Sequence, residues 1–380
     1  MHAPYARGVS DVRAELQRAT ERLIAVHPPS AVTGRQIAAE ADVNYARIHR
    51  HFGSKDQLIR STIQDLGGRY MADALPPGAL IPTPGVLARH PLFARSLTNL
   101  LLDEAAPVPN PIAPLASSHR SGLSALRDDL GPDEIDVLTA VVLSMEFTGL
   151  VHWPHLEQIR LLGGMETSVH REITAAITSM VAGRGAFVEP PRPRRVPPRS
   201  AQTRPLNQER SIEERLVHAA AALLAEKAPS AITGRELAAR AGVNYGRIHS
   251  TFGSAADVCA AAVDSQAAEL LRGYGSDELP GFFSMNAHPG FVRFLTRMSL
   301  APDYGDDRRF FPFLERLFAR HEGRHGMIAP ITRFRYALSV MTQVTWALLE
   351  PSLSDALARP ADELEPGAAG YLTTLIRSGT

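Results

Sequence analysis

One stretch of sequence occurs twice in this chain, and this internal repeat constrains its fold more than any other feature. Residues 29–54 read PSAVTGRQIAAEADVNYARIHRHFGS, and residues 229–254 read PSAITGRELAARAGVNYGRIHSTFGS. Eighteen of the 26 aligned positions are identical without a gap, which chance does not produce. Weaker similarity follows, since His90-Pro91-Leu92-Phe93 recurs as His288-Pro289-Gly290-Phe291. We therefore expect two copies of one unit of about 190 residues, which is too long for a solenoid repeat.

The composition excludes several classes of protein. The 380 residues carry 40 Lys and Arg against 40 Asp and Glu, so any anion-binding surface must be local. One cysteine, Cys259, excludes a disulfide framework and a cysteine-rich metal site, and we expect it to be a small core residue. The N-terminus lacks the apolar segment of a signal peptide, and no apolar run reaches about 18 residues. These features predict a soluble cytoplasmic protein without a membrane span.

Helical spacing of apolar residues dominates throughout, so the predicted fold class is all-α. The repeat and the Pro and Gly clusters suggest five parts: a first DNA-binding domain at 9–70, a first helical body at 71–182, a linker at 183–210, a second DNA-binding domain at 211–273 and a second helical body at 274–380. The segment 183–210 contains six prolines and seven arginines, which predicts an extended linker. Contact of its arginines with phosphate is the alternative.

The repeated stretch has the pattern of a helix-turn-helix. Thr33 and Gln36 form a predicted capping box, which the second copy keeps with Thr233 and Glu236. A short helix over 35–41 should stop at Asp42, where the copy has Gly242, because both residue types tolerate a left-handed backbone. Asn44 and Asn244 are suitable N-caps for second helices that run to Phe52 and Phe252. Ile37, Ala38, Val43, Ile48 and Phe52 should pack inward, which leaves Tyr45, Arg47, His49 and Arg50 outside.

The run from Thr33 to Leu58, including Ala41-Asp42-Val43-Asn44 and His51-Phe52-Gly53-Ser54-Lys55, resembles the DNA-binding signature of the TetR family of transcriptional regulators. The signature covers about 50 residues per copy, whereas the rest of each copy resembles the family only in length and helical character. The resemblance implies that three N-terminal helices bind DNA and that the remaining helices bind a ligand and dimerise. Two copies in one chain therefore resemble a covalently fused dimer.

The resemblance assigns DNA-binding roles by position. Arg35 and Arg235 open the first helix of the motif, and Tyr45, Arg47, Tyr245 and Arg247 face the major groove, where a guanidinium can bind guanine in a bidentate manner. His49 and His249 replace the usual tyrosine of the family, and His51 and Lys55 match phosphate-contacting positions. The full predicted set is Thr33, Arg35, Asn44, Tyr45, Arg47, His49, Arg50, His51, Lys55, Thr233, Arg235, Asn244, Tyr245, Arg247 and His249. The alternative for each is a solvated surface residue.

The two copies differ at the candidate phosphate contacts. Arg50, His51 and Lys55 become Ser250, Thr251 and Ala255, whereas the candidate base readers are retained. Because phosphate contacts supply affinity and base contacts supply sequence choice, we expect two similar half-sites, the second bound more weakly. The alternative is that the second motif has lost its DNA role.

In the family the last two long helices of each subunit form a four-helix bundle. Here the matching pairs would be 133–153 with 166–182, and 330–349 with 365–377; the first member of each reaches a proline, at Trp153-Pro154 and Glu350-Pro351. Polar and aromatic groups on these apolar helices are candidates for lining an effector pocket, although bundle-edge or satisfied core positions are the alternative. They are Glu146, His152, Trp153, Gln343 and Trp346.

The sequence contains no P-loop, no GxGxxG after a strand and no HExxH, so we predict no enzymatic activity, no catalytic residue, no cofactor and no metal site. The prediction is a single-chain pseudo-dimeric regulator, more in keeping with a repressor than an activator. Its partners would be a double-stranded DNA operator with two half-sites and an unknown small-molecule effector, and two chains could pair further. The competing interpretation is an interaction or architectural protein in which only the first helix-turn-helix binds DNA.

Overall fold

A computed structural model describes residues 9–108, 110–183, 211–227, 229–272, 282–300, 312–327 and 329–377. Within these ranges every regular element is helical, as the apolar spacing predicts. Most of the predicted linker at 183–210 lies outside the described residues, so neither interpretation of its arginines is tested. No single helix of the described part is long and apolar enough to cross a membrane, and one pair, Pro132–Val151 with His155–Leu162, passes only when the two helices are taken together.

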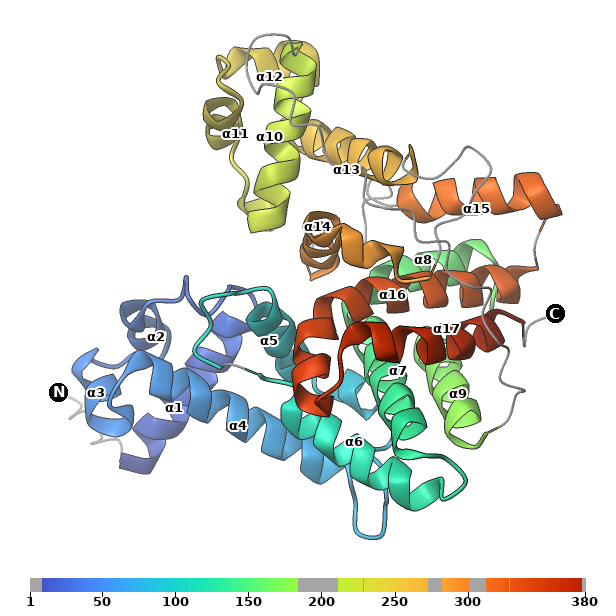
Figure 1. Cartoon of the computed structure of the whole chain (residues 1–380). Helices are drawn as coiled ribbons and strands as arrows, with labels where there is room; N and C mark the ends of the chain where they lie inside the picture. Colours follow the sequence, from blue (N-terminus) through green and yellow to red (C-terminus); the bar gives the residue numbers. More distant parts are fainter. Residues whose placement is uncertain are drawn as a thin grey trace. The chain divides into compact units, whose positions relative to one another are not determined.

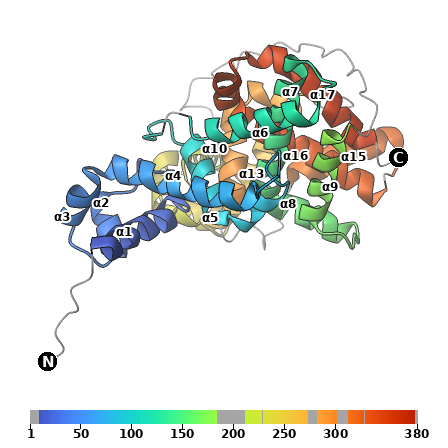
Figure 2. The same cartoon turned by 90° about the horizontal axis from the view of Figure 1, so that it is seen from below.

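Four helices form the N-terminal part of the chain: α1 (Val9–Ile24), α2 (Gly34–Glu40), α3 (Ala46–Phe52) and α4 (Lys55–Ala74). Figure 2 shows α1, α2 and α3 clustered at one end of α4. One apolar side chain from each helix is fully buried at their junction, namely Leu16, Ile37, Ile48 and Leu58. This shared core holds the short α2 and α3, which would not be stable as isolated helices.

The second copy of the repeat folds into the same series of helices. It comprises α10 (Ile212–Glu226), the short 3-10 helix η2 (Pro229–Ala231), α11 (Gly234–Ala241), α12 (Gly246–Thr251) and α13 (Ala255–Arg272) (Figure 1). The equivalent positions are again buried, here by Leu216, Leu237, Ile248 and Val258. Cys259 is also buried on α13, as expected, and burial raises the pKa of its thiol to about 11.

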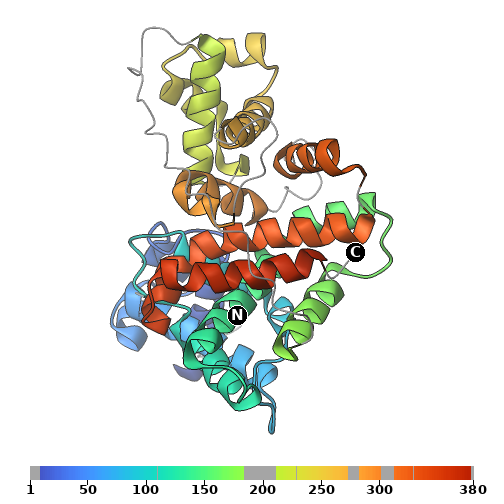
Figure 3. The ribbon, with the colours of Figure 1, turned by 45° about the vertical axis from the view of Figure 1, so that its right-hand side comes forward.

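Each helix-turn-helix is followed by further helices. After α4 come η1 (Val86–Arg89), α5 (Pro91–Leu101), α6 (Ala113–Leu126), α7 (Pro132–Val151), α8 (Trp153–Leu162) and α9 (Val169–Val181). After α13 come η3 (Ser284–Ala287), α14 (Pro289–Leu300), α15 (Pro312–His325), α16 (Pro330–Leu357) and α17 (Ala361–Arg377). Helix α16 continues through Pro351 and past the expected end at 349, and Figures 1 and 3 show it beside α17.

Contacts divide the chain into two compact units, each with residues from both halves of the sequence. The first unit runs to Val151 and adds Ile173–Val181 and Leu349–Leu364. The second unit contains His152–Glu172 together with the second half up to Leu348 and from Glu365 onwards. The two segments that change unit begin at corresponding places, two residues before Pro154 and two residues before Pro351. Each half of the sequence therefore supplies an equivalent segment to the other half.

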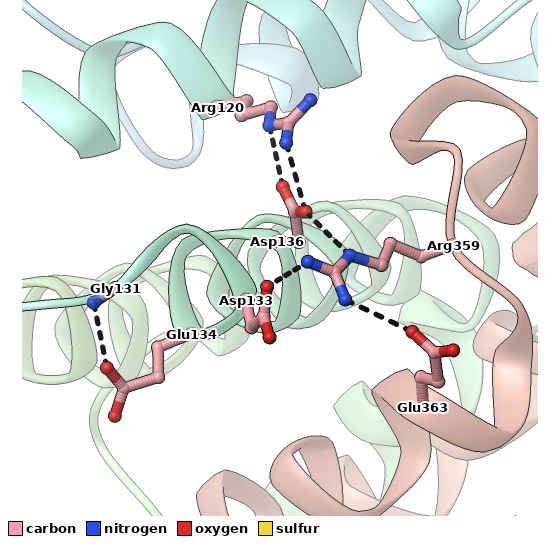
Figure 4. A network of polar contacts seen from close by, with 7 residues as sticks. All are labelled: Arg120, Gly131, Asp133, Glu134, Asp136, Arg359 and Glu363. Carbon is pink, nitrogen blue, oxygen red and sulfur yellow. Dashed lines mark hydrogen bonds and ion pairs between the residues drawn. The ribbon is translucent and has the colours of Figure 1, made fainter.

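An ion-pair network fastens the supplied segment within the first unit (Figure 4). The carboxylate of Asp136 on α7 is fully buried, and Arg120 on α6 approaches it with Nε 2.6 Å from Oδ1. Arg359, which belongs to the supplied segment, places its Nε 3.4 Å from the other oxygen of Asp136 and also pairs with Asp133 and Glu363. Burial raises the pKa of Asp136 despite Arg120, so this carboxylate depends on its arginine partners.

Replacing Arg359 by alanine is expected to destabilise the first unit by about 1–3 kcal/mol, because a buried carboxylate loses one of two cationic partners. Chemical denaturation of the full chain measures the change. Glu363→Gln is the matched control, since Glu363 is an exposed partner of Arg359. A loss for Arg359→Ala no larger than that of the control would contradict the structural role of this network.

Candidate nucleic-acid interface

The turn between α2 and α3 is built from short side chains and one left-handed residue. Thr33 and Gln36 form the predicted capping box, in which each side chain bonds to the backbone of the other residue. Asp42 adopts φ 52°, which reverses the chain, and the Asn44 carboxamide oxygen accepts the Ala46 N–H at 2.9 Å. The predicted capping box and left-handed turn residue are therefore confirmed in the first copy, whereas the N-cap position of α3 is occupied by Tyr45 and Asn44 bonds to the first helical N–H from one residue before it.

The second copy keeps the turn but not the whole capping box. Gly242 is left-handed at φ 62°, and the Asn244 oxygen accepts the Gly246 N–H at 3.0 Å. Thr233 accepts the backbone N–H of Glu236, but the Glu236 carboxylate pairs with Lys227 and does not reach back. The prediction that the second copy keeps the box was therefore half wrong, because a nearby ammonium competes for the carboxylate.

The outer face of each helix-turn-helix carries the candidate base readers. In the first copy Arg35, Tyr45, Arg47, His49 and Arg50 are all exposed. The corresponding side chains of the second copy are exposed as well: Arg235, Tyr245, Arg247 and His249. Tyr45 is 43% exposed, which is unusual for a large aromatic side chain unless it serves a surface role. The sequence thus places the same set of exposed side chains on two separate helix pairs.

A tyrosine and a histidine pair on each recognition helix. Nε2 of His49 lies 3.2 Å from the Tyr45 hydroxyl, and Nδ1 lies 3.0 Å from the Gly53 carbonyl oxygen. Their rings meet edge to face, with centroids 5.2 Å apart. The Tyr45 ring also covers Gly34, where an added Cβ would lie 2.5 Å from the ring, so a glycine is needed there. Both neighbours hold the phenol in one place.

Two candidate phosphate contacts have partners inside the domain. The Lys55 ammonium donates to the carbonyl oxygens of Val32 at 3.0 Å and Pro29 at 3.3 Å, and its side chain is 30% exposed. His51 is half-buried and its Nε2 is shielded from solvent, while its backbone oxygen accepts from Arg13. These positions leave one ammonium N–H of Lys55 available for DNA and little of His51.

The effector-pocket candidates fall into different units. Glu146 belongs to the first unit, whereas His152, Trp153, Gln343 and Trp346 belong to the second. Gln343 is satisfied by backbone, because its oxygen accepts the Phe283 N–H at 3.0 Å and its amide donates to the Ser339 carbonyl at 3.3 Å. The ring of Trp346 lies beside Phe283, with centroids 4.9 Å apart. These two candidates therefore come together as core groups around Phe283.

Glu146 has a partner that the sequence did not reveal. His119 on α6 places Nε2 3.5 Å from Oε2 of Glu146, and both side chains are 1% exposed. Among the described residues the Glu146 carboxylate has only this His119 contact at Oε2 and no partner at Oε1, and the buried Tyr70 hydroxyl also lacks a hydrogen-bond partner. Burial lowers the pKa of His119. The hydrogen bond and the charge of Glu146, together with the bond to the Leu115 carbonyl oxygen, raise this pKa by more, so the net shift is upward. A lone histidine on an amphipathic helix gives no signal for such a pairing.

A second buried histidine cluster lies in the second unit. His152 and His155 place Nδ1 at 2.9 Å and 3.2 Å from the Ser299 hydroxyl oxygen on α14. That hydroxyl in turn donates to the Leu295 carbonyl. Burial lowers the pKa of His152 to about 3 and that of His155 well below its ordinary value. Trp153 lies apart from this cluster and stacks on His170, with ring centroids 4.9 Å apart.

Two helices joined by a tight turn, with an exposed basic recognition helix, define a helix-turn-helix DNA-binding domain. Residues 16–62 match the family described as bacterial regulatory proteins, tetR family. Over this segment the chain is similar to the N-terminal DNA-binding domain of that family, which is described as one of regulatory proteins. The match does not extend to the second helix-turn-helix.

Three curated proteins are similar over the same region. They are the HTH-type transcriptional repressor Rv3405c and the HTH-type transcriptional regulator MT3513, both of Mycobacterium tuberculosis, and the HTH-type transcriptional regulator Mb3439c of Mycobacterium bovis. Each is 40% identical over 60 residues. The alignment covers 16% of this chain and 32% of each relative, so the chain spans about a third of the length of the relatives it matches.

Proposed function

We propose that this chain is a sequence-specific transcriptional repressor that binds a two-half-site operator as a single-chain pseudo-dimer. The observation that carries the proposal is the repetition of one exposed surface, Arg–Tyr–Arg–His, on two helix-turn-helix motifs 200 residues apart. One similar protein is named a repressor, which favours repression over activation. A protein that acts on chromosomal DNA in this way would work in the cytoplasm of a bacterium.

The exchange of equivalent segments supports the fused-dimer interpretation. In a symmetric dimer each subunit gives the same element to its partner. Here His152–Glu172 joins the second unit and Leu349–Leu364 joins the first, although both belong to one polypeptide. Fusion replaces two identical subunits by two that diverge separately, so one chain can read a two-part operator. Pairing of two such chains on longer DNA would be an additional step.

The second candidate function is that of an interaction or architectural protein in which only the first helix-turn-helix binds DNA. Two observations favour it: the family match covers only the first helix-turn-helix, and the second lacks the basic residues of the first at Ser250, Thr251 and Ala255. In this case the second motif would only support the fold.

A protection footprint on DNA that flanks the protein's own gene separates these two functions. Two protected half-sites with centres about 34 Å apart, saturated by one chain, would support the pseudo-dimer. Arg247→Ala in the second recognition helix should then remove protection from one half-site. A single short half-site that is insensitive to Arg247→Ala would overturn the two-headed reader and favour the one-headed alternative.

The phosphate contact of Lys55 leads to a prediction about salt. Lys55→Ala should reduce the slope of log affinity against log salt by about 1, because one cation no longer releases a counterion. Ala255→Lys should steepen the slope by a similar amount. Thermal unfolding of both variants checks for an effect of losing the Lys55 bonds to the loop before α2. If both substitutions left the salt slope unchanged, the proposed difference in affinity between the two half-sites would be wrong.

The effector is proposed to bind in the first helical body at Glu146. Glu146 and Gln343 correspond, since Glu146 lies eight residues before Pro154 and Gln343 lies eight residues before Pro351. The Gln343 amide is satisfied by backbone, whereas in the described part of the chain the Glu146 carboxylate has only His119 at Oε2 and no partner at Oε1, so a ligand that supplies a donor fits the first body. Binding there would release DNA by coupling two distinct sites.

Glu146→Gln copies the second body and tests this assignment. Without effector the substitution is expected to raise the midpoint of thermal unfolding, because it removes the cost of a buried charge with incomplete hydrogen bonding. Gln343→Glu is the reciprocal variant and should lower the midpoint. A lower midpoint for Glu146→Gln would mean that the His119 contact already satisfies the carboxylate.

A further inference from the structure

The tyrosine–histidine pair on the recognition helix occurs twice with the same geometry. In the second copy Nδ1 of His249 lies 2.8 Å from the Gly253 carbonyl oxygen, and Nε2 lies 3.3 Å from the Tyr245 hydroxyl. The rings again meet edge to face, with centroids 5.4 Å apart. One neighbouring residue differs between the copies, since Arg50 is replaced by Ser250. The contact between glycine and the tyrosine ring is kept at Gly234. The pair is therefore a conserved unit within this chain.

The carbonyl partner decides which way the hydrogen bond between the two rings runs. A carbonyl oxygen can only accept, so Nδ1 of His49 must carry the hydrogen that it donates to Gly53. In the neutral ring Nε2 then has a lone pair and no hydrogen, and the Tyr45 hydroxyl must donate to it. In the second copy Nδ1 of His249 likewise donates to the Gly253 carbonyl oxygen, and the Tyr245 hydroxyl donates to Nε2.

This direction determines what the phenol can offer to DNA. Once its single hydrogen is given to histidine, the phenol oxygen has only lone pairs left for a partner. Phosphate oxygens, guanine O6 and N7, and thymine O4 are all acceptors and cannot pair with it. The exocyclic amines of adenine N6 and cytosine N4 are the donors that the major groove presents.

We propose that Tyr45 and Tyr245 are specificity-determining residues that accept a hydrogen bond from an adenine or cytosine amine, because His49 and His249 take up the phenol hydrogen. The histidines are positioning residues, which set the polarity of the phenol without touching the base. The inference rests on the proposed DNA-reading function, and it adds the class of base that each half-site must present.

Selection of binding sites from random duplex DNA by the full chain tests the inference. Wild type should enrich adenine or cytosine at one position in each half-site. Tyr45→Phe with Tyr245→Phe should lose that preference and leave the other positions unchanged. His49→Phe with His249→Phe keeps an aromatic ring but returns the hydrogen to the phenol, so the preference at the tyrosine-dependent base pair should change. His27→Phe, at an exposed histidine outside the predicted DNA-binding set, is the matched control and should retain the preference.

A base without its amine gives the second measurement. If the selected base is adenine, replacing it by purine should weaken wild-type binding about 3- to 10-fold at that half-site and leave the Tyr→Phe variant unaffected. For cytosine the analogue is the pyrimidinone that lacks the N4 amine. Thermal unfolding establishes that each variant is folded.

The selection experiment distinguishes failure of the proposed tyrosine–amine contact from failure of the proposed DNA-binding function. If wild type enriches no sequence, the proposed function fails and the inference fails with it. If wild type enriches a site but both double variants select the same bases at every position, only the inference is overturned. Unchanged wild-type binding after the amine is removed from the adenine or cytosine of the tyrosine-dependent base pair would also overturn it.

Discussion

Replacing both Arg47 and Arg247 by alanine is expected to abolish specific binding and leave weak, salt-sensitive binding to any DNA. Both arginines are exposed in the first turn of a recognition helix, α3 and α12 respectively. A bidentate contact between a guanidinium and guanine is worth about 5- to 150-fold in discrimination. If each arginine contacts a half-site of its own, the two losses should multiply. Titration of operator and scrambled DNA by each single variant and by the double variant measures this effect.

The single variants test whether both heads work. If both read bases, Arg47→Ala and Arg247→Ala should each reduce affinity for the operator and have little effect on scrambled DNA. Arg50→Ser is the control for charge, because it removes one cation of the same helix and should reduce both affinities together. An Arg247→Ala protein that binds the operator like wild type would show that the second motif is silent.

Acidification is expected to destabilise the second unit through its buried histidines. His152 and His155 are neutral in the folded protein, since burial lowers the pKa of the first to about 3 and lowers that of the second strongly. An unfolded histidine has its ordinary pKa near 6.5 and binds a proton below it, so the unfolded state takes up more protons as the pH falls. The stabilising effect of neutral burial is therefore fully present above pH 6.5 and is lost towards pH 3.

The expected size is about 1.4 kcal/mol per pH unit for each histidine. Between pH 6.5 and 4.5 His152 alone would remove about 2–3 kcal/mol, and His155 adds a loss of the same sign. Chemical denaturation at half-unit pH steps measures the slope. His155→Gln should reduce the slope by about half, even if it lowers the stability at neutral pH, whereas His27→Gln at an exposed position should leave it unchanged. Equal slopes for wild type and His155→Gln would contradict this assignment.

The local architecture of the DNA-binding motifs was predictable because short-range interactions decide it. Three features depend on residues within a few positions of each other: the Thr33 capping box, the left-handed residues Asp42 and Gly242, and the Asn44 bond to the Ala46 N–H. The apolar spacing that predicted Ile37 and Ile48 inside likewise follows from helical geometry. Such features are set by chain chemistry before any distant contact forms.

Tertiary structure alone decided which distant residues meet. The exchange of His152–Glu172 for Leu349–Leu364, the contact of Arg359 with Asp136 and the sharing of Ser299 by two histidines join positions that are far apart in sequence. A helix pattern shows that a residue faces inward but not which partner it finds there, because that depends on how whole helices pack. The repeated sequence therefore determined the two helix-turn-helix motifs, whereas the packing of whole helices determined which segments belong to each compact unit.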